Sequence, residues 1–158
     1  LLSPSKTYNI AGLGYAYAII RDDRLRRRFT SAKGHTLAEI NALSYFAAEA
    51  AYRHGDPWRL ELLAYLRGNR DLIVEFVQRE LPGLRLSTME ATYLAWLDFR
   101  PLEIAEPATL LEPEAGLFLS EGRAFGAPGH ARLNFGCPRP LLAEALPRLR
   151  DTVRAAGS

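Results

Sequence analysis

The sequence predicts an α+β fold, in which a short and mostly antiparallel sheet carries helices on one side. Two observations indicate this class. The middle of the chain contains two long segments with a helical apolar period and clear end signals, and the second half contains four short strand-like segments followed by an amphipathic helix. With 48% hydrophobic residues, the 158-residue chain is long and apolar enough to bury a core.

The N-terminal segment, residues 1–14, is expected to be a loop because Pro4 and two glycines interrupt any longer element. Residues 15–20, with the sequence YAYAII, are a run of aromatic and β-branched residues that predicts a buried strand. The polar residues 21–34 then predict a connection that contains about one helical turn.

The same polar connection contains a basic cluster, with arginines at positions 24, 26, 27 and 28. Such a cluster suits a phosphate-bearing partner. A solvated surface is the favoured interpretation, because Asp22 and Asp23 offset the charge and few aromatic residues accompany it. The formal net charge of the chain is only +2, so no nucleic-acid partner is expected.

Residues 35–55 predict the first long helix. Thr36 and Glu39 have the spacing of a capping box, in which two side chains bond to free backbone N–H groups of the first turn. Gly55, at the other end, is a typical helix-stop residue. The apolar residues between these signals recur with a helical period.

The second long helix is predicted to begin with Asp56 as its N-cap and Pro57 in its first turn, and to stop before Pro82. Gly68 lies in its middle and costs about 1 kcal/mol of stability relative to alanine. A slight bend, or a close contact with another segment, is therefore expected at Gly68.

The second half of the chain changes character, because short apolar runs alternate there with glycine and proline. Four strands and a closing helix are predicted at residues 84–89, 91–100, 115–126, 130–136 and 140–156. These elements are expected to pack as one compact layer against the second long helix.

Composition limits the surroundings in which the protein is expected to work. The apolar runs are far shorter than the ~20 residues of a membrane span, so no membrane partner is expected. The single cysteine, Cys137, has no partner for an internal disulfide, which favours a reducing cytoplasm. We therefore expect a cytoplasmic protein.

Lysine is rare in this chain, where Lys6 and Lys33 stand against eighteen arginines. Lys6 lies in the stretch SPSKTYNIAGLG, in which Ser3 and Ser5 offer hydroxyl groups to a phosphate or another polar ligand. A lysine becomes a useful nucleophile when burial or a nearby cation depresses its pKa. From the residues alone, a solvated lysine in a polar loop remains the alternative.

The stretch SPSKTYNIAGL closely resembles the cofactor-lysine segment of the fold-type I pyridoxal-phosphate enzymes, the aspartate aminotransferase superfamily. Within it, the resemblance is best to the cystathionine β-lyase or C–S lyase group of the MalY/PatB type. Three later segments resemble this group in the same order: AAYRHGDPWRLELLAYLRGNRDLIVEF, EATYLAWLDFR and GRAFGAPGHARLNFGCPRPLLAEAL. Together they cover nearly the whole chain.

This resemblance implies roles for five residues. Lys6 would hold pyridoxal phosphate covalently and then act as general base at the substrate Cα. Ser3 and Ser5 would lie near the cofactor phosphate. Arg132 would hold the substrate α-carboxylate, and Asn134 would orient Arg132 or its loop. No metal ion is implied.

The chain departs from the superfamily pattern at one position. Many relatives have an arginine that pairs with the cofactor phosphate eight residues after the lysine, where this chain has Gly14. The departure agrees with the C–S lyase group better than with typical aminotransferases. His35 lies in a loop that is often near the partner subunit's active site in this superfamily, although a solvated histidine is the favoured interpretation.

The resemblance also implies that the chain is a C-terminal fragment, because family members have the lysine about two-thirds of the way along. Residues 1–55 would be a remnant of the large cofactor-binding domain, and residues 56–158 the connecting helix and the small domain. The family's partner for the pyridinium nitrogen precedes the lysine, so the fragment alone is expected to be inactive.

The function that the resemblance implies for the parent protein is that of a pyridoxal-phosphate C–S β-lyase. Such an enzyme cleaves a small sulfur-containing amino acid to a thiol, pyruvate and ammonia, and a homodimer is expected. Two alternatives remain open. One is an aminotransferase that uses the same lysine and arginine, and the other is a non-catalytic regulatory module with an aminotransferase-like domain.

Overall fold

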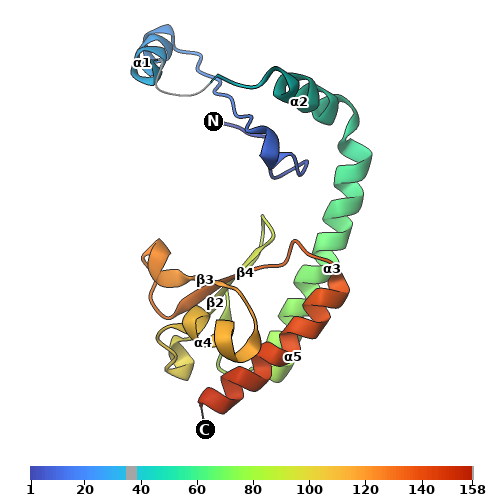
Figure 1. Ribbon diagram of the computed structural model, residues 1–158, viewed down its shortest axis with the longest axis vertical. Helices are drawn as coiled ribbons and strands as arrows, with labels where there is room; N and C mark the ends of the chain where they lie inside the picture. The colour runs from blue at the N-terminus through green and yellow to red at the C-terminus, as the bar shows by residue number, and fades with distance from the viewer. Residues whose placement is uncertain (35–38, 158) are drawn as a thin grey trace. The chain divides into compact units, whose positions relative to one another are not determined.

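The computed structural model describes residues 1–34 and 39–157 (Figure 1). These residues form five α-helices and four short strands: α1 (Asp23–Lys33), α2 (Ala42–His54), α3 (Asp56–Glu80), β1 (Arg85–Leu86), β2 (Leu94–Asp98), α4 (Pro107–Ala115), β3 (Ser120–Glu121), β4 (His130–Asn134) and α5 (Arg139–Ala156). The chain divides into two compact units, Leu1–Leu63 and Ala64–Ser158, and α3 begins in the first unit and ends in the second.

The second unit is built on a four-stranded sheet with the strand order β1-β2-β4-β3, in which every pair is antiparallel. Successive side chains of a strand point to opposite faces of a sheet. Ala95 and Leu97 of β2 are fully buried on one face. Trp96 lies between them in sequence and opposite Arg132 of β4, so both belong to the other face. The predicted α+β class is confirmed.

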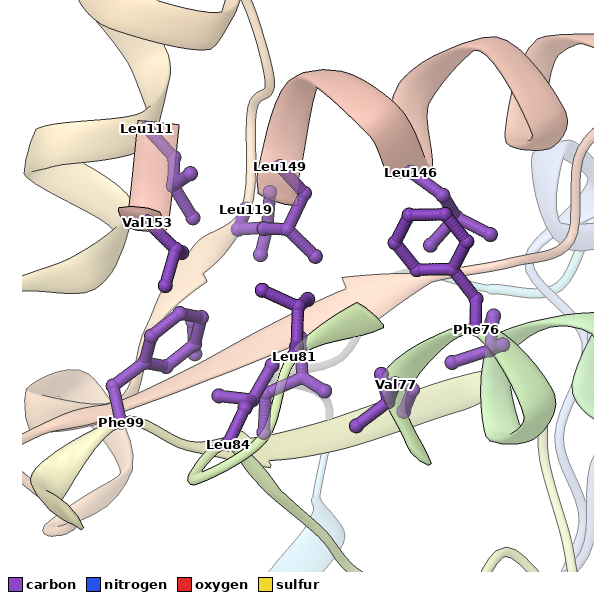
Figure 2. Packing of buried hydrophobic residues seen from close by; sticks show 14 of the residues in the cluster. Phe76, Val77, Leu81, Leu84, Phe99, Leu111, Leu119, Leu146, Leu149 and Val153 are labelled. Atoms are coloured by element: carbon purple, nitrogen blue, oxygen red, sulfur yellow. The ribbon is translucent and has the colours of Figure 1, made fainter. Parts of the chain in front are cut away.

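One hydrophobic core lies between the buried face of the sheet and helices α3, α4 and α5 (Figure 2). Its labelled side chains come from all three helices, from the turn after α3 and from residues next to the strands: Phe76, Val77, Leu81, Leu84, Phe99, Leu111, Leu119, Leu146, Leu149 and Val153. Burial of each large apolar side chain contributes about 1.5–3 kcal/mol. The core therefore stabilises the second unit and leaves the opposite sheet face available for polar side chains.

The two predictions with the clearest end signals are confirmed. Helix α3 spans 25 residues and ends at Glu80, just before Pro82. Asp56 was predicted as the N-cap, the residue just before the helix, but it is the first helical residue. A difference of one residue is within the usual uncertainty of helix ends. Helix α5 contains Pro140 in its first turn, as predicted.

The close contact expected at Gly68 is present. A Cβ atom at this position would lie 2.5 Å from Nη2 of Arg139, the first residue of α5. Such a distance is far shorter than a van der Waals contact, so the guanidinium can lie against α3 only because Gly68 has no side chain.

Asn69, the next residue of α3, is fully buried, and its amide is completely hydrogen-bonded. Its Nδ2 donates to the backbone carbonyls of Phe135 at 3.0 Å and Cys137 at 2.9 Å. Its Oδ1 accepts a hydrogen bond from Nε of Arg139 at 3.0 Å. A buried polar group that is fully satisfied favours one specific arrangement of its neighbours. Asn69 therefore fixes α3 to the connection between β4 and α5.

The prediction of a buried strand at residues 15–20 is wrong. Within the described residues, Tyr17 makes a single antiparallel bridge to Leu2, and Ile19 is 69% exposed. A strand is stabilised by a continuous ladder with a neighbour, and one bridge does not provide it.

The segment 21–34 contains a helix of 11 residues, α1, instead of about one turn. The side chain of Asp22 accepts a hydrogen bond from the N–H of Leu25 at 2.6 Å, and Arg26 pairs with Asp23 within the first turn. Both interactions stabilise a helix start. No residue of α1 is buried, which agrees with a solvated arginine cluster.

Helix α2 begins later than predicted. Asn41 is its N-cap, because the Asn41 side chain accepts a hydrogen bond from the N–H of Leu43 at 2.8 Å. Glu39, which was expected inside the first turn, is not helical. Thr36, the predicted cap, and His35 lie outside the described residues. The predicted end is correct, since Gly55 follows the last helical residue.

Helix α4 was not predicted, because Pro107 and Pro113 both suggest a break. Pro107 lies in the first turn, where the missing N–H has no partner to lose. The N–H of Ala108 donates to the carboxylate of Glu121 at 2.9 Å, so a residue of β3 caps this helix. The strands β1 and β3 are also shorter than predicted, with two residues each.

Candidate cofactor and substrate site

Lys6 lies in a turn that backbone hydrogen bonds close. The N–H of Tyr8 donates to the carbonyl of Pro4 at 2.9 Å, and the N–H of Ile10 donates to the carbonyl of Ser5 at 3.0 Å. Pro4 is buried, whereas Lys6 is exposed. Within the described part of the chain, the Lys6 side chain has neither a hydrogen bond nor an ion pair. Its amine is therefore free to react.

Ser3 and Ser5 lie side by side in the same turn. Their Oγ atoms are 2.8 Å apart, and Ser3 donates to the carbonyl of Tyr15 at 2.6 Å. Oγ of Ser5 lies 3.4 Å from the same carbonyl. The first unit therefore brings three of the predicted site residues, Lys6 and the two serines, into one turn.

The chemistry of this turn fits pyridoxal phosphate, which carries an aldehyde and a phosphate. A free primary amine, as on Lys6, is the group with which an aldehyde condenses. Each serine hydroxyl has one proton, and that of Ser3 is directed at Tyr15. Rotation of this hydroxyl would allow it to donate to a phosphate oxygen instead. The side chains of Lys6, Ser3 and Ser5 thus have the functional groups that such a cofactor requires.

Aromatic residues hold the lysine turn against the junction of α2 and α3. The ring of Tyr8 meets Tyr52 edge-on, with 5.7 Å between the centroids, and its hydroxyl lies 3.4 Å from Oδ1 of Asp56. A Cβ on Gly55 would lie 2.7 Å from the Tyr8 ring, so this glycine provides the space for it. The hydrogen bond between the hydroxyls of Tyr17 and Tyr52 raises the pKa of Tyr52 to about 12.

Arg132 lies in β4, on the sheet face opposite the core. Its Nη2 donates to Oγ of Ser120 at 3.0 Å, and its Cζ lies 4.6 Å from the centre of the Phe125 ring. The side chain is half-buried, and among the described residues no carboxylate pairs with it. A partly buried guanidinium without a counter-ion is unfavourable unless a ligand supplies one.

Arg139 provides a comparison, because it is also half-buried and has no carboxylate partner in residues 1–34 and 39–157. Its Nε donates to Asn69, its Nη2 donates to the carbonyl of Tyr65 at 2.8 Å, and its guanidinium stacks on the Tyr65 ring at 4.5 Å. Arg139 is therefore satisfied within the protein. Arg132, in contrast, keeps Nε and Nη1 without an acceptor among the described residues.

Asn134 lies two residues after Arg132 on the same face of β4. Its Oδ1 accepts a hydrogen bond from the N–H of Gly136 at 2.8 Å, which fixes the turn at the end of the strand. Within the described residues no hydrogen bond joins Asn134 to Arg132. The second unit therefore places both predicted residues on one strand, with Asn134 holding the loop.

Two residues that contact Arg132, Ser120 and Phe125, were not predicted. A sequence signal for Ser120 exists, because Ser120 and Arg132 each lie six residues from Gly126 and therefore pair in a hairpin centred on that glycine. No comparable signal identifies Phe125, whose place depends on the short 3₁₀ helix Gly122–Phe125.

Other chemistries find little support in the described residues. Within residues 1–34 and 39–157, no three or more His, Cys, Asp or Glu side chains form a group that could bind a metal ion. Burial raises the pKa of the Cys137 thiol, which disfavours the reactive thiolate. None of the helices described is long and apolar enough to cross a membrane.

Comparisons with known proteins identify relatives along almost the whole chain. Residues 1–149 match the family described as "Aminotransferase class I and II". Cystathionine beta-lyase PatB from Bacillus subtilis is 39% identical over 154 residues, which are 94% of this chain and 40% of PatB.

Two solved structures show the same similarity in three dimensions. The crystal structure of OvoB superimposes with a TM-score of 0.91 at 46% identity, over 96% of this chain and 39% of OvoB. Cystalysin from Treponema denticola, whose structure contains a pyridoxal 5′-phosphate cofactor, superimposes with a TM-score of 0.89 at 31% identity, over 97% of this chain and 40% of cystalysin. The chain thus spans about 40% of the length of the curated relatives it matches.

Proposed function

Because the chain belongs to the aminotransferase class I and II family, we propose that the whole protein is a pyridoxal-phosphate-dependent C–S β-lyase. The observation that carries this proposal is the free amine of Lys6 beside the hydroxyls of Ser3 and Ser5. The similarity to cystathionine beta-lyase PatB at 39% identity supports a lyase. Gly14, at the place of a phosphate-pairing arginine, supports it as well.

Lys6 has two tasks in this proposal. It holds the cofactor covalently, and its amine, once the substrate amine displaces it, takes the proton from the substrate Cα. Ser3 and Ser5 donate hydrogen bonds to the cofactor phosphate. Pyridoxal phosphate, when bound, supplies the electron sink for the electrons left at Cα.

Arg132 orients the substrate. Its planar guanidinium holds the α-carboxylate through two parallel hydrogen bonds, and this fixes the direction of the Cα–H bond from which Lys6 takes the proton. Loss of the Cα proton and cleavage of the Cβ–S bond release the thiol. With L-cystathionine and one water molecule as reactants, the products are L-homocysteine, pyruvate and ammonia.

The two lysines of the chain allow a direct test on the whole protein that contains it. The protein is incubated with pyridoxal phosphate, reduced with borohydride and digested, and the labelled peptide is identified by mass spectrometry. We expect the label on Lys6 and not on Lys33. Lys6→Ala should abolish pyruvate formation from L-cystathionine, whereas Lys33→Ala should not. A label on Lys33, or an active Lys6→Ala variant, contradicts the proposal.

An aminotransferase is the second candidate, favoured by the family to which the chain belongs and by the same pair of Lys6 and Arg132. In an aminotransferase, Lys6 would transfer the Cα proton to a carbon of the cofactor. In a lyase, loss of this proton is followed by elimination of the thiol. The products distinguish the two. Pyruvate and a thiol formed from cystathionine without an amino acceptor identify a lyase, and a keto acid formed only with an acceptor identifies a transferase.

The 158-residue chain alone is proposed to be inactive, because it spans about 40% of the length of its relatives. We propose residues 1–55 as part of the large cofactor-binding domain and residues 56–158 as the connecting helix and small domain. Saturable labelling of Lys6 together with cystathionine cleavage by the isolated chain would show that it is active after all.

The whole protein is also proposed to be a cytoplasmic homodimer. Several large apolar side chains of the first unit are exposed in the described chain, among them Ile19 at 69%, Leu43 at 67% and Phe46 at 70%. Exposed apolar surface of this kind is usually covered, either by other residues of the same protein or by a partner subunit, and the partner subunit is the cover that we propose. Light scattering of the whole protein at micromolar concentration checks the proposal, and a monomeric mass argues against it.

A further inference from the structure

Two side chains from outside β4 restrain the guanidinium of Arg132. Ser120 accepts a hydrogen bond from Nη2, and the ring of Phe125 lies under Cζ. We propose that Ser120 and Phe125 are positioning residues, which hold Arg132 in the orientation that binds the substrate α-carboxylate. This inference rests on the proposed function, because both residues act through Arg132.

Phe125 is itself held by a row of aromatic rings on the same sheet face. Trp96 meets Phe125 edge-on, with 5.8 Å between centroids and an angle of 78° between the planes. On its other side Trp96 stacks with His130, at 5.5 Å and 21°. Pairs of this kind stabilise ring positions beyond simple burial. The Phe125 ring therefore presents its face to Arg132 from a supported position.

Ser120 is held by the backbone rather than by its own side chain. It is the cross-strand partner of Arg132 in the ladder between β3 and β4. The next residue, Glu121, accepts hydrogen bonds from the N–H groups of Ala108 and Gly122, which ties β3 to α4. The hydroxyl of Ser120 is thus fixed at hydrogen-bond distance from Arg132 before any ligand binds.

These restraints have a predictable kinetic consequence. An arginine that is already immobile loses less conformational entropy when a carboxylate binds to it. The carboxylate contact is the same in the ground state and in the transition state, because the carboxylate does not react. Arg132 itself is still present when Ser120 or Phe125 is changed, so a bound substrate is held by the same carboxylate contact with the same direction of its Cα–H bond. Loss of the restraint should therefore raise KM and leave kcat nearly unchanged.

The experiment compares conservative pairs of variants in the whole protein. Ser120→Ala should raise KM for L-cystathionine about 10-fold with little change in kcat. Ser120→Thr keeps the hydroxyl, so its KM should be close to that of the unchanged protein. Phe125→Leu should raise KM about 3-fold, and Phe125→Tyr should not. Matched controls are Ser87→Ala, at an exposed serine, and Phe118→Leu, at a side chain that is 84% exposed.

A second readout separates positioning from general damage. L-Alanine and L-alaninamide are compared as competitive inhibitors, since only the first has a carboxylate. Ser120→Ala should weaken inhibition by L-alanine about 10-fold and leave inhibition by L-alaninamide unchanged. Equal weakening for both inhibitors overturns the inference, because it indicates a purely structural effect. The same test applies to Phe125→Leu if the serine variant does not fold.

Arg132→Lys distinguishes failure of this inference from failure of the proposed function. If Arg132→Lys leaves KM unchanged, Arg132 does not bind the substrate carboxylate, and the assignment in the proposed function is wrong. If Arg132→Lys raises KM about 100-fold while Ser120→Ala and Phe125→Leu behave like their controls, only the positioning role is overturned.

Discussion

At the scale of single residues, two half-buried arginines of the second unit, Arg132 and Arg139, have no carboxylate partner among the described residues. Other groups of the protein satisfy only one of them. Arg139 has its partners within the protein, in Asn69 and Tyr65. Arg132 has a hydroxyl and a ring, but no carboxylate among the described residues. Identical side chains on neighbouring elements are thus distinguished by whether their charge is satisfied without a ligand.

The contact between Gly68 and Arg139 predicts that Gly68→Ala changes the free energy of unfolding in opposite directions with and without Arg139. Gly68→Ala should lower the free energy of unfolding by about 1 kcal/mol, because the displacement of Arg139 from its hydrogen bonds outweighs the helix propensity of alanine. In an Arg139→Ala background the same substitution should stabilise by about 1 kcal/mol. Urea unfolding of the four proteins in this double-mutant cycle measures both effects, and additive values contradict the explanation.

Asp98 predicts a pH dependence of stability. Arg100 donates to both of its carboxylate oxygens, at 2.8 and 2.9 Å, and holds the pKa of Asp98 well below its usual range. The folded state therefore has the lower pKa. The resulting stabilisation is complete above the unfolded pKa of about 3.9 and declines as the pH falls below it.

Asp98→Asn should accordingly lower the free energy of unfolding by about 2 kcal/mol at pH 7. The difference from the unchanged protein should shrink as the pH is lowered toward 2.5. Chemical unfolding at a series of pH values measures this difference. Asp71→Asn is the matched control, at an exposed carboxylate whose ion pair among the described residues is with its neighbour Arg70. A difference that stays constant from pH 7 to 2.5 rules out the proposed cause.

The sequence offered candidates for the reacting groups, but none for the residues that contact Arg132. Lys6 became a candidate because lysine is rare in the chain and because its surroundings resemble a known motif. Ser120 and Phe125 were missed because their contacts with Arg132 depend on the register of β3 and on one 3₁₀ turn. Register is a tertiary property, and a shift of one residue would turn Ser120 to the other face.

At the scale of elements, the start of α2 can be tested by comparing two capping residues. Asn41→Ala should destabilise the helix by about 1 kcal/mol, because the Asn41 side chain accepts a hydrogen bond from the N–H of Leu43. Thr36→Ala, at the cap that the sequence predicts, serves as the comparison. Thermal unfolding followed by circular dichroism measures both variants. A larger loss for Thr36→Ala than for Asn41→Ala would favour the predicted start.

Elements with strong end signals were predicted well, and elements that depend on their surroundings were not. Helices α3 and α5 have a proline in the first turn and a clear apolar period, which are local properties. Helix α4 depends on Glu121, a residue of another element, for its cap. The strand expected at residues 15–20 lacks a neighbour to pair with beyond Leu2 within the described chain, which no local pattern can indicate.

At the scale of the whole molecule, the two units differ in what stabilises them. Within the part of the chain that the structure describes, the buried members of the hydrophobic core cluster run from Ile73 to Val153, all in the second unit. The described helices of the first unit bury little, and α1 buries no residue at all. Apolar burial is the dominant stabilising contribution in folding, so we expect the isolated chain to be far more stable in its second unit.

Hydrogen exchange followed by NMR or mass spectrometry measures this difference in the isolated chain. Amides of the paired strands β2 and β4 should exchange only on global unfolding of the second unit, whereas amides of α1 should exchange many orders of magnitude faster. Comparable protection in α1 and β4 would show that α1 is stabilised by contacts other than those described.

The contact between Gly68 and Arg139 also constrains how this protein family can diverge. As long as position 139 is an arginine that lies against α3, glycine is favoured at position 68, because a Cβ there would displace the guanidinium. A relative that has lost the arginine is released from this constraint and can gain the more helix-favouring alanine. The two positions, 71 residues apart, should therefore change together across relatives, in the order arginine first and glycine second.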